Sequence, residues 1–232
     1  MKRDVQPELL DQLPAGDHHA VHSRRDLQKI NAWMGHAGTM GRMLAAALPG
    51  RPPQSIVELG SGDGTMLLKL AKRFAPRWKP SRVVLVDRQH AVSPETTAAF
   101  ASLSWPVEFA QMDVFEWLER SRPASTEVTI ATLFLHHFVE HDLRRLLQCV
   151  AAQTRLFMAC EPRRSTPALG GTRLLRLIGC NQVTRHDARV SVRAGFTGHE
   201  LSALWPGDPR WRLVERQAGP FTHCFFAERT GA

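Results

Sequence analysis

A glycine-rich turn behind an apolar run constrains the fold of this 232-residue chain more than any other feature. Residues 57–65 read VELGSGDGT, and a segment with helical character follows at 66–74. Glycine permits backbone conformations with positive φ and lets the backbone come close to a ligand. A strand, a glycine turn and a helix N-terminus in this order are typical of a nucleotide-binding corner.

The spacing of the glycines distinguishes between the kinds of such corners. In a dinucleotide fingerprint G-x-G-x-x-G that begins at Gly60, the third glycine would stand at position 65, which is Thr65. A P-loop needs a lysine at the end of the turn, and the next lysine is Lys69. The pattern E-x-G-x-G-x-G from Glu58 to Gly64 instead resembles the cofactor loop of the class I S-adenosylmethionine (SAM) methyltransferases. SAM has no phosphate, and its amino-acid end carries an ammonium and a carboxylate. Backbone N–H groups and a nearby side-chain carboxylate suit such an end.

Further apolar runs end in polar residues, in the order expected for successive strands. Residues 83–87 read VVLVD, and Asp87 lies roughly 20 residues after the glycine turn, where a carboxylate accepts hydrogen bonds from ribose hydroxyls. The next run ends at Asp113, a position that contacts the adenine amino group in the family, and the run 155–160 ends at Glu161. The residues that the resemblance assigns to the cofactor site are Glu58, Gly60, Ser61, Gly62, Gly64, Asp87, Arg88, Asp113, Val114 and Leu133.

Strands alternate with helices from residue 54 to about 160, which predicts a parallel sheet with right-handed crossovers. The resemblance implies an α/β fold, a Rossmann-like three-layer sandwich with a seven-stranded, mostly parallel sheet whose last strand is antiparallel. Residues 1–50 are expected to form an N-terminal helical lid and residues 51–232 the SAM-binding methyltransferase domain. Within that domain, residues 161–205 are interpreted as an insertion that could cover the substrate. Residues 23–26 (SRRD) resemble a capping box and predict that a helix begins there.

The loop after the fourth predicted strand holds the candidate catalytic residues His136 and His137. It lacks the N-P-P-Y, D-P-P-Y and Pro-Cys signatures of amide, adenine and cytosine methylation, and instead resembles the Leu-His-His segment of small-molecule methyltransferases that act on quinols and polyketide-type phenols. A phenol or enol must lose a proton, and histidine suits that task at neutral pH. The alternative is that both histidines only orient the loop or cap the next helix. The sequence offers no convincing set of metal ligands, so no metal is expected.

Composition limits the partners and the location of the protein. The net charge is +8, but the arginines and lysines are dispersed without interleaved aromatics, so no nucleic-acid groove is expected. No apolar run approaches the roughly 20 residues of a membrane span, and the N-terminus lacks a secretory pattern, which favours a cytoplasmic protein. The four cysteines form no C-x-x-C pair, which argues against a structural zinc site or a disulfide framework.

The sequence thus predicts a SAM-dependent methyltransferase that modifies oxygen or carbon of a small, aromatic or quinol-like molecule. Two alternatives stay open: an RNA or protein methyltransferase, and a non-catalytic SAM-binding module in a biosynthetic complex. The missing base-methylation motifs weigh against the first alternative, whereas the second shares the same cofactor loop. The sequence does not indicate the acceptor or the oligomeric state.

Overall fold

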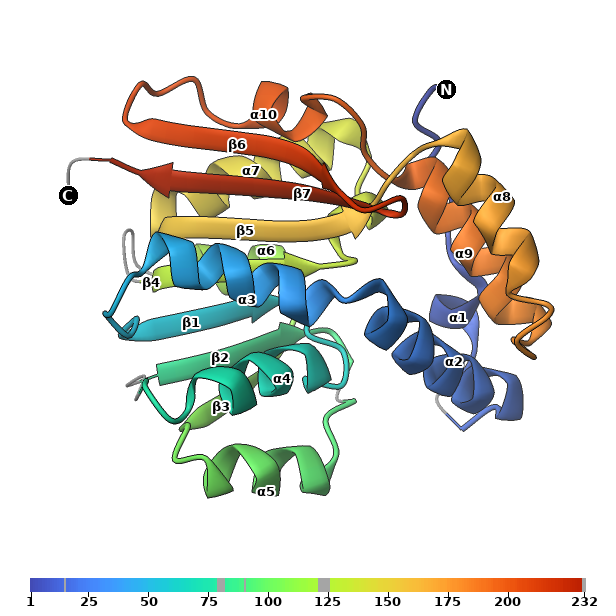
Figure 1. Ribbon diagram of the computed structural model, residues 1–232, viewed down its shortest axis with the longest axis horizontal. Helices are drawn as coiled ribbons and strands as arrows, with labels where there is room; N and C mark the ends of the chain where they lie inside the picture. The colour runs from blue at the N-terminus through green and yellow to red at the C-terminus, as the bar shows by residue number, and fades with distance from the viewer. Residues whose placement is uncertain (15, 79–81, 90, 121–125, 231–232) are drawn as a thin grey trace.

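A seven-stranded sheet in the order β3-β2-β1-β4-β5-β7-β6 forms the centre of the computed structural model, which describes residues 1–232 except 15, 79–81, 90, 121–125 and 231–232 (Figure 1). The strands are β1 (Ser55–Leu59), β2 (Arg82–Asp87), β3 (Val107–Gln111), β4 (Thr126–Thr132), β5 (Thr154–Pro162), β6 (Trp211–Ala218) and β7 (Thr222–Arg229). Strands β1 to β5 pair in parallel, and β7 runs antiparallel to both β5 and β6. The predicted mostly parallel, Rossmann-like sheet with an antiparallel last strand is confirmed.

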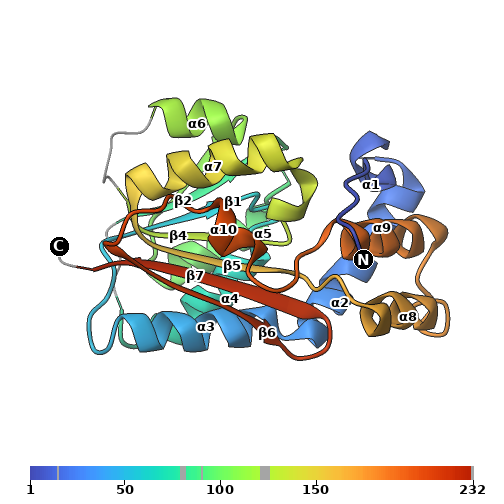
Figure 2. The same cartoon turned by 90° about the horizontal axis from the view of Figure 1, so that it is seen from above.

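Helices cover both faces of the sheet, as the view from above shows (Figure 2). One face carries α3 (His36–Ala47), α4 (Thr65–Phe74) and α5 (Pro94–Ser102), and the other carries α6 (Val114–Arg120), α7 (Glu140–Gln153) and α10 (Glu200–Leu204). In α7 the apolar side chains recur three to four residues apart, so one stripe of the helix is buried against the sheet. The sheet therefore separates two apolar clusters and is itself covered on both sides.

Register brings the ends of the central strands to one edge. Leu59, the last residue of β1, pairs with Val86 of β2 on one side and with Ala131 of β4 on the other. The glycine turn, the end of β2 and the loop after β4 therefore begin side by side. Ligands of parallel α/β sheets bind at this carboxyl edge.

Four helices gather beyond the carboxyl edge, although they come from two distant parts of the chain (Figures 1 and 2). They are α1 (Leu9–Gln12), α2 (His18–Met34), α8 (Thr166–Leu174) and α9 (Gln182–Ala194). Helix α9 contacts both α1 and α2. No helix among the described residues is both long enough and apolar enough to cross a membrane.

The predicted helix start at residues 23–26 is wrong. Helix α2 begins at His18, where Asp17 accepts hydrogen bonds from the backbone N–H groups of His19 (2.8 Å) and Ala20 (3.3 Å). The serine and aspartate of the supposed box are buried in the middle of α2 and face α9. Ser23 and Asp26 both bond the hydroxyl of Thr184, at 2.9 and 3.2 Å. These polar side chains thus join two helices rather than cap one.

Candidate active site

The glycine turn between β1 and α4 leaves open space beside its middle residue. Gly60, Gly62 and Gly64 have φ values of 65°, 54° and 70°, a left-handed conformation that only glycine adopts without strain. A Cβ atom at Gly60 would lie 2.1 Å from the Phe134 ring, so the turn packs directly on the loop after β4. A Cβ atom at Gly62 would meet no described atom within 4 Å. The backbone at Gly62 therefore faces space that a ligand can fill.

Glu58 is a buried carboxylate that the surrounding residues leave partly unsatisfied. It is 1% exposed, and its Oε2 has no hydrogen-bond partner within the described part of the chain. Burial, together with the neighbouring carboxylates of Asp63 and Asp87, raises the pKa of Glu58 well above its usual value. A buried oxygen without a donor is costly. The site therefore favours a ligand that brings hydrogen-bond donors or positive charge.

Asp87 ties the end of β2 to the glycine turn. Its Oδ2 accepts a hydrogen bond from the backbone N–H of Gly62 at 2.8 Å, and its Oδ1 accepts one from Gln89 at 2.9 Å. Each carboxylate oxygen keeps a further lone pair for another donor. A hollow beside Asp87 is lined by Ser61, Leu85, Asp87, Gln89, Val92, Phe109, Ala110 and Gln111. The carboxylate thus stands at the mouth of a hollow between β2 and β3.

The residues that the sequence assigns to the cofactor lie in three places. The ends of β1, β2 and β4, with the turn and the loop that follow, hold Glu58, Gly60, Ser61, Gly62, Gly64, Asp87 and Leu133. The start of α6 holds Asp113 and Val114, and Arg88 is exposed after β2. Asp113 accepts a hydrogen bond from the backbone N–H of Phe115 at 2.8 Å, so it caps α6. Leu133 has a φ of 54°, which bends the chain sharply as it leaves β4.

We expect Asp87→Ala to weaken SAM binding by about 1.5–3 kcal/mol, roughly 10- to 150-fold. The variant removes a charged acceptor and also releases the N–H of Gly62. Calorimetric titration with SAM measures the effect. Glu108→Ala is a matched control, because that carboxylate on the adjacent strand β3 is 57% exposed and pairs with Arg82. Equal affinities of the two variants would contradict a role for Asp87.

A buried carboxylate at the end of β5 organises the loop after β4. Glu161 accepts hydrogen bonds from the backbone N–H groups of Phe134 (3.0 Å), Leu135 (2.9 Å) and His136 (3.3 Å). Its Oε2 also lies 2.8 Å from Nδ1 of the His136 ring. Burial raises the pKa of Glu161, but the bond to His136 outweighs this effect and the pKa is lowered. The sequence singled out Glu161 only as a strand end and did not predict this role.

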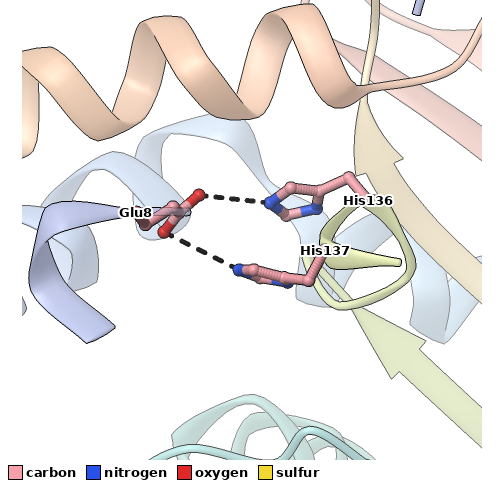
Figure 3. Close-up of side chains that lie close together, drawn as sticks. All are labelled: Glu8, His136 and His137. Atoms are coloured by element: carbon pink, nitrogen blue, oxygen red, sulfur yellow. Dashed lines mark hydrogen bonds and ion pairs between the residues drawn. The ribbon is translucent and has the colours of Figure 1, made fainter. Parts of the chain in front are cut away.

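Glu8 of the N-terminal segment faces both histidines of the loop (Figure 3). Its Oε1 is 3.4 Å from Nε2 of His136, and its Oε2 is 3.7 Å from Nε2 of His137. Burial lowers the pKa of His136, but its bonds to Glu161 and Glu8 outweigh burial and raise the pKa to about 9. Burial raises the pKa of Glu8, but the bonds to both histidines hold it well below its usual value. We call Glu8, His136 and His137 the histidine–glutamate cluster.

The two histidines differ in how they are held. His136 is 3% exposed, and both of its ring nitrogens face a carboxylate. The His137 side chain is 33% exposed, and its Nδ1 lies 3.0 Å from the carbonyl oxygen of Phe134. A carbonyl oxygen can only accept, so Nδ1 of His137 carries the proton and Nε2 keeps its lone pair in the neutral ring.

Contacts from α9 and from the loop after β4 hold the N-terminal segment in place. Arg3 donates hydrogen bonds to the carbonyl oxygens of Ala194 (2.7 Å) and Phe138 (2.8 Å). Asp187 of α9 accepts from the first two N–H groups of α1, at 2.8 and 3.0 Å, and Ser191 donates to Glu8. The sequence did not predict Glu8, because it lies 128 residues before His136 and no local motif marks it.

Residues 56–155 match the family model described as a methyltransferase domain, which covers the turn, β2, β3, β4 and α7. Residues 56–155 form a methyltransferase domain. No curated protein is similar enough in sequence to count as a relative. The strand order and the antiparallel β7 agree with that assignment.

Several solved structures of methyltransferases share the fold of this chain, including the helices that flank its methyltransferase domain. The plantazolicin methyltransferase BamL, in complex with a triazolic desmethylPZN analog and SAH, is 10% identical with a TM-score of 0.68, over 94% of this chain and 92% of that one. The plantazolicin methyltransferase BpumL is 13% identical with a TM-score of 0.64, over 89% and 90%. An O-methyltransferase family protein from Burkholderia thailandensis is 16% identical with a TM-score of 0.59, over 94% of this chain but only 64% of that protein.

The residues at the carboxyl edge fit SAM, the cofactor of this class of domain. The unpartnered Oε2 of Glu58 is a buried acceptor, and the free space beside Gly62 is where a ligand can approach the backbone. The Asp87 carboxylate stands next to the hollow between β2 and β3. SAM has an ammonium, a ribose and an adenine ring, and these groups need the kinds of contact that the residues at this edge offer.

Proposed function

We propose that the protein transfers the methyl group of SAM to an oxygen or a carbon of a small, aromatic or quinol-like acceptor. The observation that supports this proposal is the histidine–glutamate cluster, held by the loop whose Phe134 packs against Gly60 of the cofactor turn. Phenols, enols and quinols lose a proton when they are methylated. A histidine paired with a carboxylate accepts such a proton near neutral pH.

We assign the cofactor contacts to the carboxyl edge. Glu58 and the backbone of the glycine turn hold the amino-acid end of SAM, and Asp87 accepts hydrogen bonds from the ribose hydroxyls. Asp113 and Val114 face the adenine, with Arg88 and Leu133 at the borders of the pocket. SAM supplies a methyl group that is already activated by the positive charge on sulfur. The protein has to align the acceptor with that methyl group and keep water away.

The two histidines receive different roles. We infer that His136, which is buried between Glu161 and Glu8, is a positioning residue that fixes the loop. His137 is the partly exposed member of the cluster, and its Nε2 lone pair is the atom that can take the proton of an acceptor hydroxyl. Glu8, at 3.7 Å, then stabilises the imidazolium that forms.

We infer that the part of residues 1–50 that precedes α3 acts as a helical lid, together with α8 and α9 of the segment 161–205. Helices α1, α2, α8 and α9 gather beyond the edge where the methyl group would be delivered (Figure 2). When α1 is docked on α9, the lid brings Glu8 to His136 and His137 and thereby completes the cluster. Such a closure joins water exclusion to the assembly of the acid–base site.

We expect His137→Gln to lower kcat/KM for a phenolic or quinol acceptor by about 100- to 10,000-fold at neutral pH, because the proton acceptor is lost. SAM affinity should stay unchanged. Transfer of a labelled methyl group from SAM to a panel of phenols, quinols and enols measures the effect. His141→Gln is the matched control, since that histidine is 89% exposed on α7 and pairs only locally with Asp142. Activity of His137→Gln within twofold of the control would remove His137 from the reaction.

The same assay separates the alternatives. Label that appears only in RNA or in protein would replace the small-molecule proposal by macromolecule methylation. SAM binding without transfer to a small-molecule extract, to RNA or to protein would favour a non-catalytic SAM-binding module.

A further inference from the structure

We propose that the histidine–glutamate cluster binds a divalent cation of the zinc class. One ligand atom from each of Glu8, His136 and His137 lies within 4.8 Å of the other two. A tetrahedral zinc ion with ligands at about 2.0–2.1 Å separates neighbouring ligand atoms by about 3.3–3.4 Å. The distances from Glu8 Oε1 to Nε2 of His136 (3.4 Å) and from Glu8 Oε2 to Nε2 of His137 (3.7 Å) are close to that spacing, so the carboxylate presents one oxygen to each ring. The three side chains can therefore converge on one ion with small movements.

The opposite nitrogen of each ring provides an independent argument. In metal-binding histidines the nitrogen that does not bind the ion donates to a carboxylate or a carbonyl, which fixes the tautomer. Nδ1 of His136 lies 2.8 Å from Glu161, and Nδ1 of His137 lies 3.0 Å from the carbonyl oxygen of Phe134. Both contacts leave Nε2 as the nitrogen that faces Glu8. Two adjacent rings thus present the same free atom to one carboxylate (Figure 3).

Charge favours a cation at this place. The carboxylates of Glu8 and Glu161 lie at the two ring nitrogens of His136, and Glu161 is fully buried. With both histidine rings neutral, the cluster and Glu161 together carry two negative charges, which one divalent cation balances. Metal binding would displace protons from the cluster, as is usual for histidine ligands.

The composition of the cluster selects the kind of ion. Two imidazoles and one carboxylate form a ligand set that suits zinc and neighbouring transition metals, whereas magnesium and calcium prefer oxygen ligands. Three protein ligands leave a fourth position, and the partly exposed side of His137 is where it opens. A closed structural zinc site would have four protein ligands. The cluster therefore has the form of a site that keeps one position for another molecule.

The cation would also have a role in methyl transfer, and this role rests on the proposed function. A hydroxyl oxygen of the acceptor would occupy the fourth position and release its proton to solvent. The resulting oxyanion would attack the methyl carbon of SAM, the carbon–sulfur bond would break, and its electron pair would stay on sulfur. His137 is then a ligand, and the cation takes over the task that Nε2 performs in the cation-free protein.

Zinc binding to the full chain, after removal of metal by a chelator, tests the site without SAM or acceptor. We expect calorimetry to show one zinc site per chain, lost or weakened at least about 100-fold in Glu8→Gln and in His137→Gln. His141→Gln is the control, because it removes an exposed histidine outside the cluster. Cobalt(II) should give the visible absorption of a four-coordinate site in the wild type and not in Glu8→Gln. Thermal unfolding and SAM binding of each variant establish that it is folded.

The outcomes distinguish the site from the proposed function. Zinc that does not bind, or that binds equally to the wild type, Glu8→Gln and His137→Gln, overturns the cation site and leaves methyl transfer to His137. Zinc that binds as expected to a protein without methyl transfer supports the site and overturns the proposed function. Transfer that stops on chelation and returns with zinc supports both.

Discussion

Replacing Gly62 with arginine is expected to abolish SAM binding. The residue has a φ of 54° and faces space with no described atom within 4 Å of a Cβ, so a long side chain would occupy the place assigned to the cofactor. The left-handed conformation adds about 1–2 kcal/mol of strain, which is small compared with the roughly 5–15 kcal/mol stability of a typical domain. The variant should therefore fold and still fail to bind. Calorimetric titration with SAM and with its demethylated product measures the loss.

Two further glycine variants make this result interpretable. Gly62→Ala fits the free space and should bind SAM with a smaller loss than the arginine variant. Gly170→Arg places the same side chain on the exposed surface of α8, where a Cβ also meets no described atom within 4 Å, and should bind SAM normally. An affinity of Gly62→Arg equal to that of Gly170→Arg would show that SAM does not pass beside Gly62.

Removing the Glu161 carboxylate is expected to cause a large loss in the free energy of unfolding. Glu161→Leu leaves three backbone N–H groups and the His136 ring without their acceptor in a fully buried place. Breaking a buried charge pair from one side costs about 3–5 kcal/mol. Urea unfolding at neutral pH measures the change. Glu228→Gln, which breaks a partly exposed pair with Arg212, should cost less than about 1 kcal/mol.

A double variant tests the cause of that loss. In Glu161→Leu combined with His136→Leu the buried ring whose Nδ1 lost its acceptor is removed as well, so part of the stability should return. The backbone N–H groups of the loop stay without an acceptor, so recovery should be incomplete. A double variant less stable than Glu161→Leu would contradict the view that the buried His136 ring, without Glu161 at its Nδ1, contributes to the loss.

Local patterns in the sequence predicted the sheet and the glycine turn well. An apolar run followed by alternating glycines predicts a strand and a turn with positive φ, and all three glycines adopt it. The predicted helix start at residues 23–26 was wrong, because the local pattern there does not distinguish a helix start from a position inside a helix. Serine and aspartate three residues apart bond a backbone N–H at a helix start, but inside a helix the same pair can face a neighbour. Thr184 of α9 is that neighbour, and nothing in residues 23–26 indicates its presence.

The candidate catalytic cluster could be predicted only in part. The loop with His136 and His137 is visible in the sequence because the two histidines follow an apolar strand. Glu8 is not visible, since its place depends on Arg3 and Asp187, which dock a short helix onto α9. Contacts between residues so far apart follow from the tertiary fold and have no spacing signature.

The contact between Gly60 and the Phe134 ring has a consequence for efforts to change the range of substrates. Trimming the ring to admit a bulkier molecule would also remove the surface on which the nucleotide-side turn rests. Conversely, any side chain introduced at Gly60 would have to displace that ring. Under the proposed function, acceptor selectivity and cofactor affinity are therefore linked through the contact between Gly60 and Phe134, and the two positions have to be redesigned as a pair.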